Sequence, residues 1–275
     1  MSLIRAAALG LLLGLAGCTD TPSPDPDPST HGEAGTGWTA LPADDLQSGY
    51  AFLQPDTQAL QDDDFSNPGY LWVDRGAQLF ATSEVGEPSC ASCHGAGDAA
   101  LAGVAARFPK VDPSSGALIN LEGRINLCRE RHQNRSALAY ESEALLGLTA
   151  YVAEQSRGMS LAPDRSAPAM ALAETGRDYF FTQRGQLNLS CHQCHDQSWG
   201  KRLRGDTISQ GHGNAFPAYR LEWQSLGSLQ RRLRDCDTGV RAEPLPYGDQ
   251  VYVAVELYLA QRAAGLDIET PGVRR

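Results

Sequence analysis

Two short motifs with the same five-residue pattern carry the most specific chemistry in this sequence. Residues 90–94 read Cys-Ala-Ser-Cys-His and residues 191–195 read Cys-His-Gln-Cys-His, so both match C-x-x-C-H. Two thiols three positions apart can form thioethers to the vinyl groups of a haem, and the next imidazole can bind the iron. The residues predicted to hold two c-type haems are Cys90, Cys93 and His94 for the first, and Cys191, Cys194 and His195 for the second.

Two further cysteines are candidate ligands for the second face of each iron. In many electron-transfer haems this ligand is a Met, but Met159 and Met170 lie after the predicted closing helix of the first half and before the second motif. Cys128 and Cys236 instead stand one in each half, between the haem motif and the closing helix. We expect each to bind the iron of its own half as a thiolate. Anionic sulfur stabilises ferric iron, so the potential should be low.

Other interpretations of these positions stay open at the level of sequence. Cys128 and Cys236 could form a disulfide with each other or be two inert buried thiols. His132 and His212 are competing ligands. His132 follows several arginines and has no His counterpart in the second half, which favours a place on the surface.

Basic side chains gather in the sequence around Cys236. Arginines near a cysteine favour its thiolate and can bind a small oxyanion through two nitrogens. They could instead pair with haem propionates or form a solvated face. The residues concerned are Arg231, Arg232, Arg234 and Arg241 near Cys236, and Lys201, Arg202 and Arg204 after the second motif.

The elements that must position these residues repeat along the chain. Gly76-x-x-x-Phe80 and Gly176-x-x-x-Phe180 each predict a helix that leads into a haem motif, and residues 144–155 and 251–262 predict the two closing helices. We therefore expect an all-α fold of two tandem cytochrome c-like domains, residues 46–165 and 166–275, each wrapped around a covalently attached haem. The second domain would hold the active-site haem.

The first residues predict export. An arginine and a short apolar run end at Cys18, which indicates a lipoprotein-type signal peptide over residues 1–17 with Cys18 as the lipidated residue. An ordinary cleaved signal peptide is the alternative. Residues 18–45 are rich in Pro and Asp and predict an extended tether, so we expect a periplasmic protein that touches the membrane only through this anchor. The net charge of −10 argues against a nucleic-acid partner.

The sequence resembles the SoxA family of haem-bearing subunits of SoxAX cytochromes. The stretches that carry the resemblance are residues 119–128, 185–191 with Trp199-Gly200, Ser209-Gln210-Gly211, Tyr219-Arg220, Gly227-Ser228-Leu229 and 231–236. Both C-x-x-C-H motifs are present, so the chain is similar to the dihaem branch. The lipid anchor departs from the family pattern, since family members are more usually soluble periplasmic proteins.

The resemblance implies an L-cysteine S-thiosulfotransferase that joins thiosulfate to a cysteine of a SoxYZ-like carrier protein and releases two electrons. It implies His94 and Cys128 on the first iron, and His195 and Cys236 on the second. Cys236 would be the catalytic sulfur, found in the family as a persulfide, and Arg232 would hold the substrate anion. A SoxX-like monohaem cytochrome c would complete a heterodimer and accept the electrons.

Two other functions fit parts of the pattern. A thiosulfate dehydrogenase that forms tetrathionate also uses a His/Cys-ligated haem, and it differs in releasing its product without a carrier. A non-enzymatic dihaem electron carrier tethered to the membrane would have a potential near that of Met-ligated haems.

Overall fold

The computed structural model describes residue 41 and residues 43–83, 86–95 and 98–275. The predicted signal peptide, the lipidation site Cys18 and nearly all of the tether lie outside these residues. All described residues belong to one compact unit, so the division into domains at residues 165 and 166 stays a prediction. Among the described helices, none is both long and apolar enough to cross a membrane.

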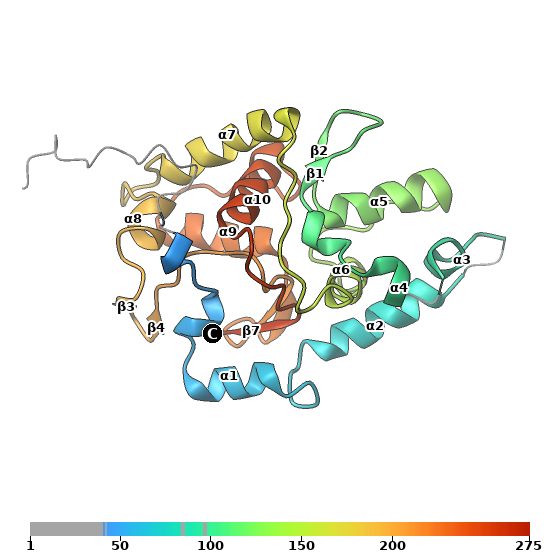
Figure 1. Cartoon of the computed structure of the whole chain (residues 1–275), viewed down its shortest axis with the longest axis horizontal. Helices are drawn as coiled ribbons and strands as arrows, with labels where there is room; N and C mark the ends of the chain where they lie inside the picture. Colours follow the sequence, from blue (N-terminus) through green and yellow to red (C-terminus); the bar gives the residue numbers. More distant parts are fainter. Residues whose placement is uncertain (1–40, 42, 84–85, 96–97) are drawn as a thin grey trace, which may run out of the picture. The chain divides into compact units, whose positions relative to one another are not determined.

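Helices dominate the described chain (Figure 1). They are α1 (Pro55–Asp62), α2 (Tyr70–Ala81), α3 (Cys90–His94), α4 (Asp98–Leu101), α5 (Leu121–His132), α6 (Glu143–Glu154), α7 (Ala167–Phe181), α8 (Cys191–His195), α9 (Leu229–Gly239) and α10 (Gln250–Arg262), with short 3-10 turns at Ala43–Asp45, Gly49–Phe52 and Ala105–Arg107. The closing helices predicted at 144–155 and 251–262 match α6 and α10 within one residue at each end.

The described residues contain seven short strands, so the expected all-α class is right only in part. They are β1 (Lys110–Val111), β2 (Leu118–Ile119), β3 (Arg202–Leu203), β4 (Asp206–Thr207), β5 (Ala218–Arg220), β6 (Ser225–Gly227) and β7 (Gly272–Arg274). The pairs β1–β2 and β3–β4 are antiparallel, whereas β5 pairs with β6 antiparallel and with β7 parallel. Strands of two or three residues are too short to produce a period-2 pattern, so the sequence did not predict them.

A close helix crossing lies beside the first haem motif. On α2 one face is buried, with Val73, Gly76 and Phe80 at helical spacing. A Cβ atom at Gly76 would lie 2.0 Å from the carbonyl oxygen of Gly147 on α6, so the two backbones meet where neither residue has a side chain. The ring of Phe80 packs on Tyr151 of α6, with centroids 5.2 Å apart.

The same crossing recurs beside the second haem motif. A Cβ atom at Gly176 on α7 would lie 2.1 Å from the carbonyl oxygen of Ala254 on α10. Phe180 packs on Tyr258, with ring centroids 5.4 Å apart. The Gly-x-x-x-Phe repeat seen in the sequence thus marks two equivalent helix pairs, α2–α6 and α7–α10. Within each pair the two helices lie side by side (Figure 1).

We expect Gly176→Ala to lower the free energy of unfolding by about 1–3 kcal/mol, because the added methyl group must push α7 away from α10. Urea unfolding followed by circular dichroism measures this change. Gly239→Ala is the matched control, since a Cβ at that helical position meets nothing within 4 Å. Equal midpoints for the two variants would show that the crossing is not tight.

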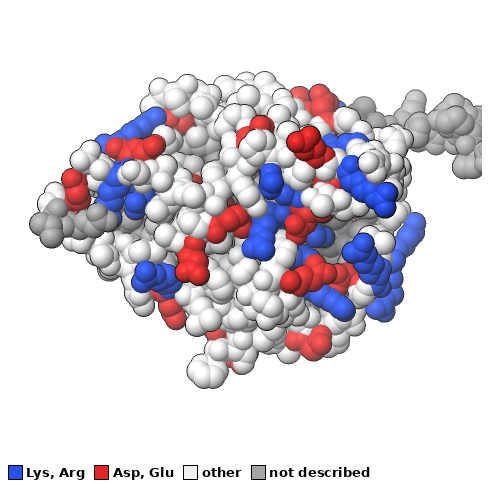
Figure 2. Space-filling model, turned by 180° about the vertical axis from the view of Figure 1, so that it is seen from behind, with Lys and Arg blue, Asp and Glu red and all other residues white. Residues whose placement is uncertain are grey.

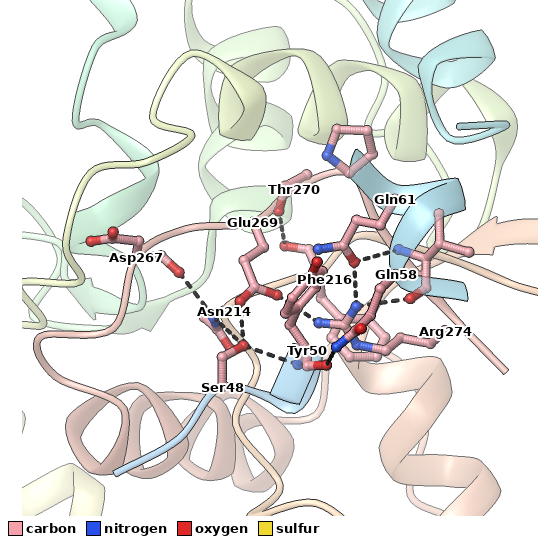
Figure 3. A network of polar contacts seen from close by, with 12 residues as sticks. Ser48, Tyr50, Gln58, Gln61, Asn214, Phe216, Asp267, Glu269, Thr270 and Arg274 are labelled. Atoms are coloured by element: carbon pink, nitrogen blue, oxygen red, sulfur yellow. Dashed lines mark hydrogen bonds and ion pairs between the residues drawn. The ribbon is translucent and has the colours of Figure 1, made fainter. Parts of the chain in front are cut away.

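The segment after residue 45 is joined to the C-terminal strand by a network of polar contacts (Figure 3). Gln61 of α1 accepts a hydrogen bond from Arg274 of β7, and Arg274 also forms an ion pair with Glu269 at 2.7 Å. Glu269 accepts from the hydroxyl of Ser48, whose oxygen accepts from Asn214 at 3.2 Å. This network connects the beginning and the end of the described chain to the segment around residue 214.

Candidate haem and thiol sites

The first C-x-x-C-H motif opens onto an apolar cavity. Ser89 caps α3 by accepting a hydrogen bond from the backbone of Ser92 at 3.1 Å, which fixes the start of the motif. Cys90 and His94 line a cavity that contains about 860 Å³ of empty space, its mouth included. Phe80, Leu121, Leu148 and Val152 are among its apolar walls.

Cys128 also lines this cavity, so the structure brings Cys90, His94 and Cys128 together around one space. It projects from α5, whose start is capped by Asn120 accepting from the backbone of Gly123 at 2.9 Å. Burial raises the pKa of Cys90, and Gln133 donates to its sulfur at 3.5 Å. Cys93 is exposed at the edge of the motif.

The second motif is held by a more polar set of contacts. Gln193 accepts from the backbone of Ser190 at 2.8 Å, which caps α8. Burial raises the pKa of Cys191 to about 11, and the Arg184 guanidinium lies 3.6 Å from its sulfur. Cys194 is half-buried in the same turn.

His195 is fixed in orientation by the segment that follows the motif. Its Nδ1 lies 2.7 Å from the carbonyl oxygen of Ser209, and a carbonyl can only accept, so Nδ1 carries the proton. Gly211 has φ +76°, and a Cβ there would lie 2.8 Å from the imidazole ring. The Ser209 carbonyl and the backbone at Gly211 thus fix the orientation of the ring, and Nε2 keeps a lone pair for a metal.

Gln210 anchors this segment, a role that the sequence did not suggest. It is fully buried, its Oε1 accepts from the backbone of Gln47 at 2.8 Å, and its Nε2 donates to the carbonyl of Asp45 at 2.6 Å. The segment that orients His195 is therefore tied to the residues that follow the predicted tether.

Cys236 faces His195 from α9, and Arg232 stands one helical turn before it. Burial by itself would raise the pKa of Cys236, but the Arg232 charge and the adjacent His195 side chain outweigh it and lower the pKa to about 7. A thiol and an imidazole nitrogen that face each other in this way are the donors that a haem iron binds on its two sides. The structure therefore brings His195, Cys236 and Arg232 together.

The other basic residues near Cys236 in the sequence, and those after the second motif, either stack on aromatic rings or are exposed to solvent. Arg231 stacks on Trp223 with its guanidinium carbon 4.2 Å from the ring centroid, and Arg234 stacks on Tyr247 at 4.5 Å and donates to the carbonyl of Leu245. Lys201, Arg202, Arg204 and Arg241 are exposed. On the face shown in Figure 2, positive and negative side chains are interspersed rather than separated into one broad patch.

Arg220 joins the site although the sequence pattern gave it no role. It comes from β5, is only 6% exposed, and the charge of the neighbouring Arg232 is one of the causes that lower its pKa. Its Nη2 donates to Glu222 at 3.0 Å, while its Nε is buried without a hydrogen-bond partner among the described residues. Two guanidinium groups therefore lie near Cys236, from two different elements.

Asp237, next to Cys236, is buried, and hydrogen bonds and a nearby arginine offset the cost of burying its carboxylate. Its Oδ2 accepts from the hydroxyls of Tyr179 at 2.7 Å and Tyr252 at 2.6 Å, and Arg184 lies 3.8 Å from its Oδ1. Because Arg184 also contacts Cys191, one arginine connects the haem motif with the helix that carries Cys236.

The structure bears on three of the alternatives left open by the sequence. Cys128 and Cys236 are both free, so no disulfide joins them. His132 is exposed at the end of α5, as its arginine-rich surroundings indicated. His212 is 7% exposed and its Nε2 lies 3.1 Å from Gln210, so it supports the His195 segment.

Comparison with known proteins also indicates a cytochrome c. Residues 75–161 match the family model described as SoxA/TsdA, cytochrome c domain. The L-cysteine S-thiosulfotransferase subunit SoxA of Rhodovulum sulfidophilum is 38% identical over 232 residues, which cover 84% of this chain and 81% of that protein. The chain belongs to the SoxA family. A second SoxA subunit, from Pseudaminobacter salicylatoxidans, is 37% identical over 85% of this chain and 82% of its own length.

A solved structure shares most of this fold. The crystal structure of SoxXA from P. pantotrophus matches with a TM-score of 0.80 and 35% identity, covering 84% of this chain and 87% of that one. A cytochrome c domain implies covalently bound haem, and the residues present fit it. Cys90, His94 and Cys128 line one apolar cavity, and Gly211 leaves the His195 ring room that any larger residue would fill.

Proposed function

We propose that this SoxA chain is a subunit of an L-cysteine S-thiosulfotransferase, the name carried by its relatives in Rhodovulum sulfidophilum and Pseudaminobacter salicylatoxidans. It would couple thiosulfate oxidatively to a cysteine of a SoxYZ-like carrier and pass two electrons to a cytochrome c. The observation that carries the proposal is the cluster of His195, Cys236 and Arg232, where a guanidinium lowers the pKa of a partly buried thiol.

The haem-holding residues follow from the two motifs. Cys191 and Cys194 would form the thioethers of the active-site haem, with His195 and Cys236 on either side of its iron. Cys90, Cys93, His94 and Cys128 would do the same for a second haem in the first half. When bound, the haem iron supplies a site that accepts electrons one at a time.

The chemistry that this chain's own residues contribute centres on one sulfur atom. The Cys236 thiolate forms a bond to the sulfane sulfur of the thiosulfate dianion, and two electrons leave toward the partner cytochrome. The carrier's cysteine thiolate then attacks that sulfane sulfur, the bond to Cys236 breaks, and Cys236 recovers its electron pair as a thiolate. In total, one carrier thiol and one thiosulfate give one S-thiosulfonate, one proton and two electrons.

The two guanidinium groups suit the anionic end of the substrate. Arg232 would bind the sulfonate oxygens and stabilise the negative charge that develops during transfer. The unpartnered Nε of Arg220 is a further donor for the same oxygens. Because the charges on the face in Figure 2 are mixed, the attraction for a dianion comes from these buried arginines rather than from a broad field on that face.

The partners and location belong to the same proposal. The SoxXA structure contains a SoxX chain by its title, so we propose a SoxX-like monohaem cytochrome c as the second subunit. We propose a periplasmic location with a lipid anchor at Cys18. The equivalent α2–α6 and α7–α10 pairs support two tandem cytochrome c-like domains, at residues 46–165 and 166–275.

The test is a reconstitution of the haem-loaded protein with a SoxX-type partner, thiosulfate and a SoxYZ-type carrier. We expect the carrier to gain one thiosulfate group and to lose the proton of its cysteine thiol. Two electrons should reach the acceptor cytochrome for each adduct. Tetrathionate formed without the carrier would instead identify a thiosulfate dehydrogenase. Electron transfer without any adduct would identify an electron carrier.

A further inference from the structure

A second cavity, distinct from the first haem cavity, lies where the two halves of the chain meet. It contains about 680 Å³ of empty space, its mouth included. Its walls come from α5, α6, α9 and α10 and from the segments around residues 105–109, 213–217 and 268–270. Phe108 and Leu121 line this cavity and the first haem cavity alike, so the two spaces share a wall. Leu229 lines it from α9, the helix that carries Arg232 and Cys236.

Two buried carboxyl groups face this cavity from opposite halves. Glu122 of α5 is 8% exposed and Glu256 of α10 is 7% exposed. Oε1 of Glu256 accepts from Gln230 of α9 at 2.7 Å and from Asn120 at 3.2 Å. These contacts join α5, which carries Cys128, to α9, which carries Cys236, and to α10, the second closing helix.

Unpartnered polar atoms show that the cavity takes a polar occupant. The hydroxyl of Thr149, which is 2% exposed, and Oδ1 of Asn214, which is 4% exposed, have no hydrogen-bond partner among the described residues, and both side chains line the cavity. Buried polar atoms of this kind are normally satisfied by ordered water. Water in the cavity would give the two carboxyl groups a route for protons.

The surroundings favour the neutral form of one acid of the pair, because burial and a neighbouring negative charge both raise the pKa of each carboxyl group. Burial raises the pKa of Glu122, and Glu141 raises it further. Burial and the Glu122 charge raise the pKa of Glu256. The other ionisable groups that face the pair are Tyr140, which is protonated, and Glu141, which lies 3.9 Å from Arg231. Glu122 and Glu256 are themselves the ionisable residues among the described walls.

We propose that Glu122 and Glu256 form a proton-binding site whose occupancy follows the redox state of the protein. When one electron enters the interior from an external donor, one proton enters the cavity and converts a carboxylate of the pair to a carboxylic acid, so no net charge is added. On oxidation both leave. The proposal rests on the haems of the proposed function, because they are where the electron resides.

The pair of carboxyl groups binds a proton rather than a metal ion. A divalent cation such as Ca²⁺ takes six to eight oxygen ligands, most of them charged or oriented carbonyls. No group of three or more His, Cys, Asp and Glu side chains gathers into a metal site in the part of the chain that the structure describes. The Glu256 carboxyl group, which already accepts two amide hydrogen bonds, is better suited to share a proton with Glu122.

The test is the pH dependence of the haem midpoint potentials in the holoprotein, measured between about pH 5 and pH 9. A reduced interior binds the proton more tightly, so the wild-type potential of the first haem should fall as pH rises. Glu122→Gln and Glu256→Gln should each remove at least half of this slope. Glu243→Gln, at an exposed loop position, should leave it unchanged.

An infrared difference spectrum between the oxidised and reduced protein gives an independent readout. A carbonyl band of a protonated carboxylic acid should appear on reduction of the wild type and be lost or shifted in Glu122→Gln. A potential that does not change with pH, or a slope that survives in both variants, overturns the proposal while the coupling activity remains. A holoprotein whose mass and absorption spectrum show no first haem overturns both this inference and the dihaem assignment.

Discussion

Replacing Cys236 with alanine should reduce thiosulfate coupling to the carrier by at least about 10³-fold. The reason is that the proposed mechanism routes both bond-forming steps through this one sulfur, and the described residues place no other free cysteine beside Arg232. The measurement is the rate of carrier adduct formation by mass spectrometry. Intact mass should still report both haems attached, since Cys191 and Cys194 are untouched.

Cys128→Ala is the matched control for this prediction. It removes the equivalent thiol from the first cavity. Arg124 precedes Cys128 by one helical turn, as Arg232 precedes Cys236, but its side chain is 41% exposed and lies 3.9 Å from Asp112, so coupling should persist at a substantial rate. Loss of activity in Cys128→Ala with retention in Cys236→Ala would reverse the assignment of the active site.

Replacing Arg232 with glutamine should lower kcat/KM for thiosulfate by about 10²-fold or more. The change removes the charge that lowers the pKa of Cys236, so less of the reactive thiolate is present near neutral pH. It also removes the two-nitrogen contact that we propose for the sulfonate. Arg232→Lys keeps a positive charge but lacks the planar fork, so its activity should be intermediate.

Arg234→Gln is the control for the arginine prediction, because Arg234 lies two residues further along α9 and is engaged with Leu245 and Tyr247. It should retain near-normal kcat/KM. Steady-state kinetics over a range of thiosulfate concentrations compares the three variants. If Arg232→Gln and Arg234→Gln were equally active, the anion would have to be held by other groups.

The sequence predicted the parts of this structure that depend on spacing along the chain. The Gly-x-x-x-Phe repeat predicted both helices that lead into the haem motifs, and the structure adds that Gly76 and Gly176 are the points where these helices meet α6 and α10. The duplicated order of motif, cysteine and closing helix was enough to single out Cys128 and Cys236.

Features that depend on contacts between distant segments escaped prediction. Arg220 lies on a three-residue strand with no periodic signal, and nothing in its neighbourhood indicates that it folds next to Arg232. Glu122 sits on a helix rich in charged residues, where an acidic side chain is normally exposed, and segments distant in the sequence bury it. Gln210 is polar and gives no sequence signal, so its link to Gln47 could not be foreseen.

The position of β7 has a consequence for how the polypeptide matures. This strand, at residues 272–274, pairs with β5 and, through Arg274 and Gln61, closes onto α1. A nascent chain cannot make these contacts until residues 272–274 have been synthesised. The α2–α6 pair needs only residues 70–154, so it can assemble earlier, and thioether formation at Cys90 can precede the closure of β7 onto β5 and α1.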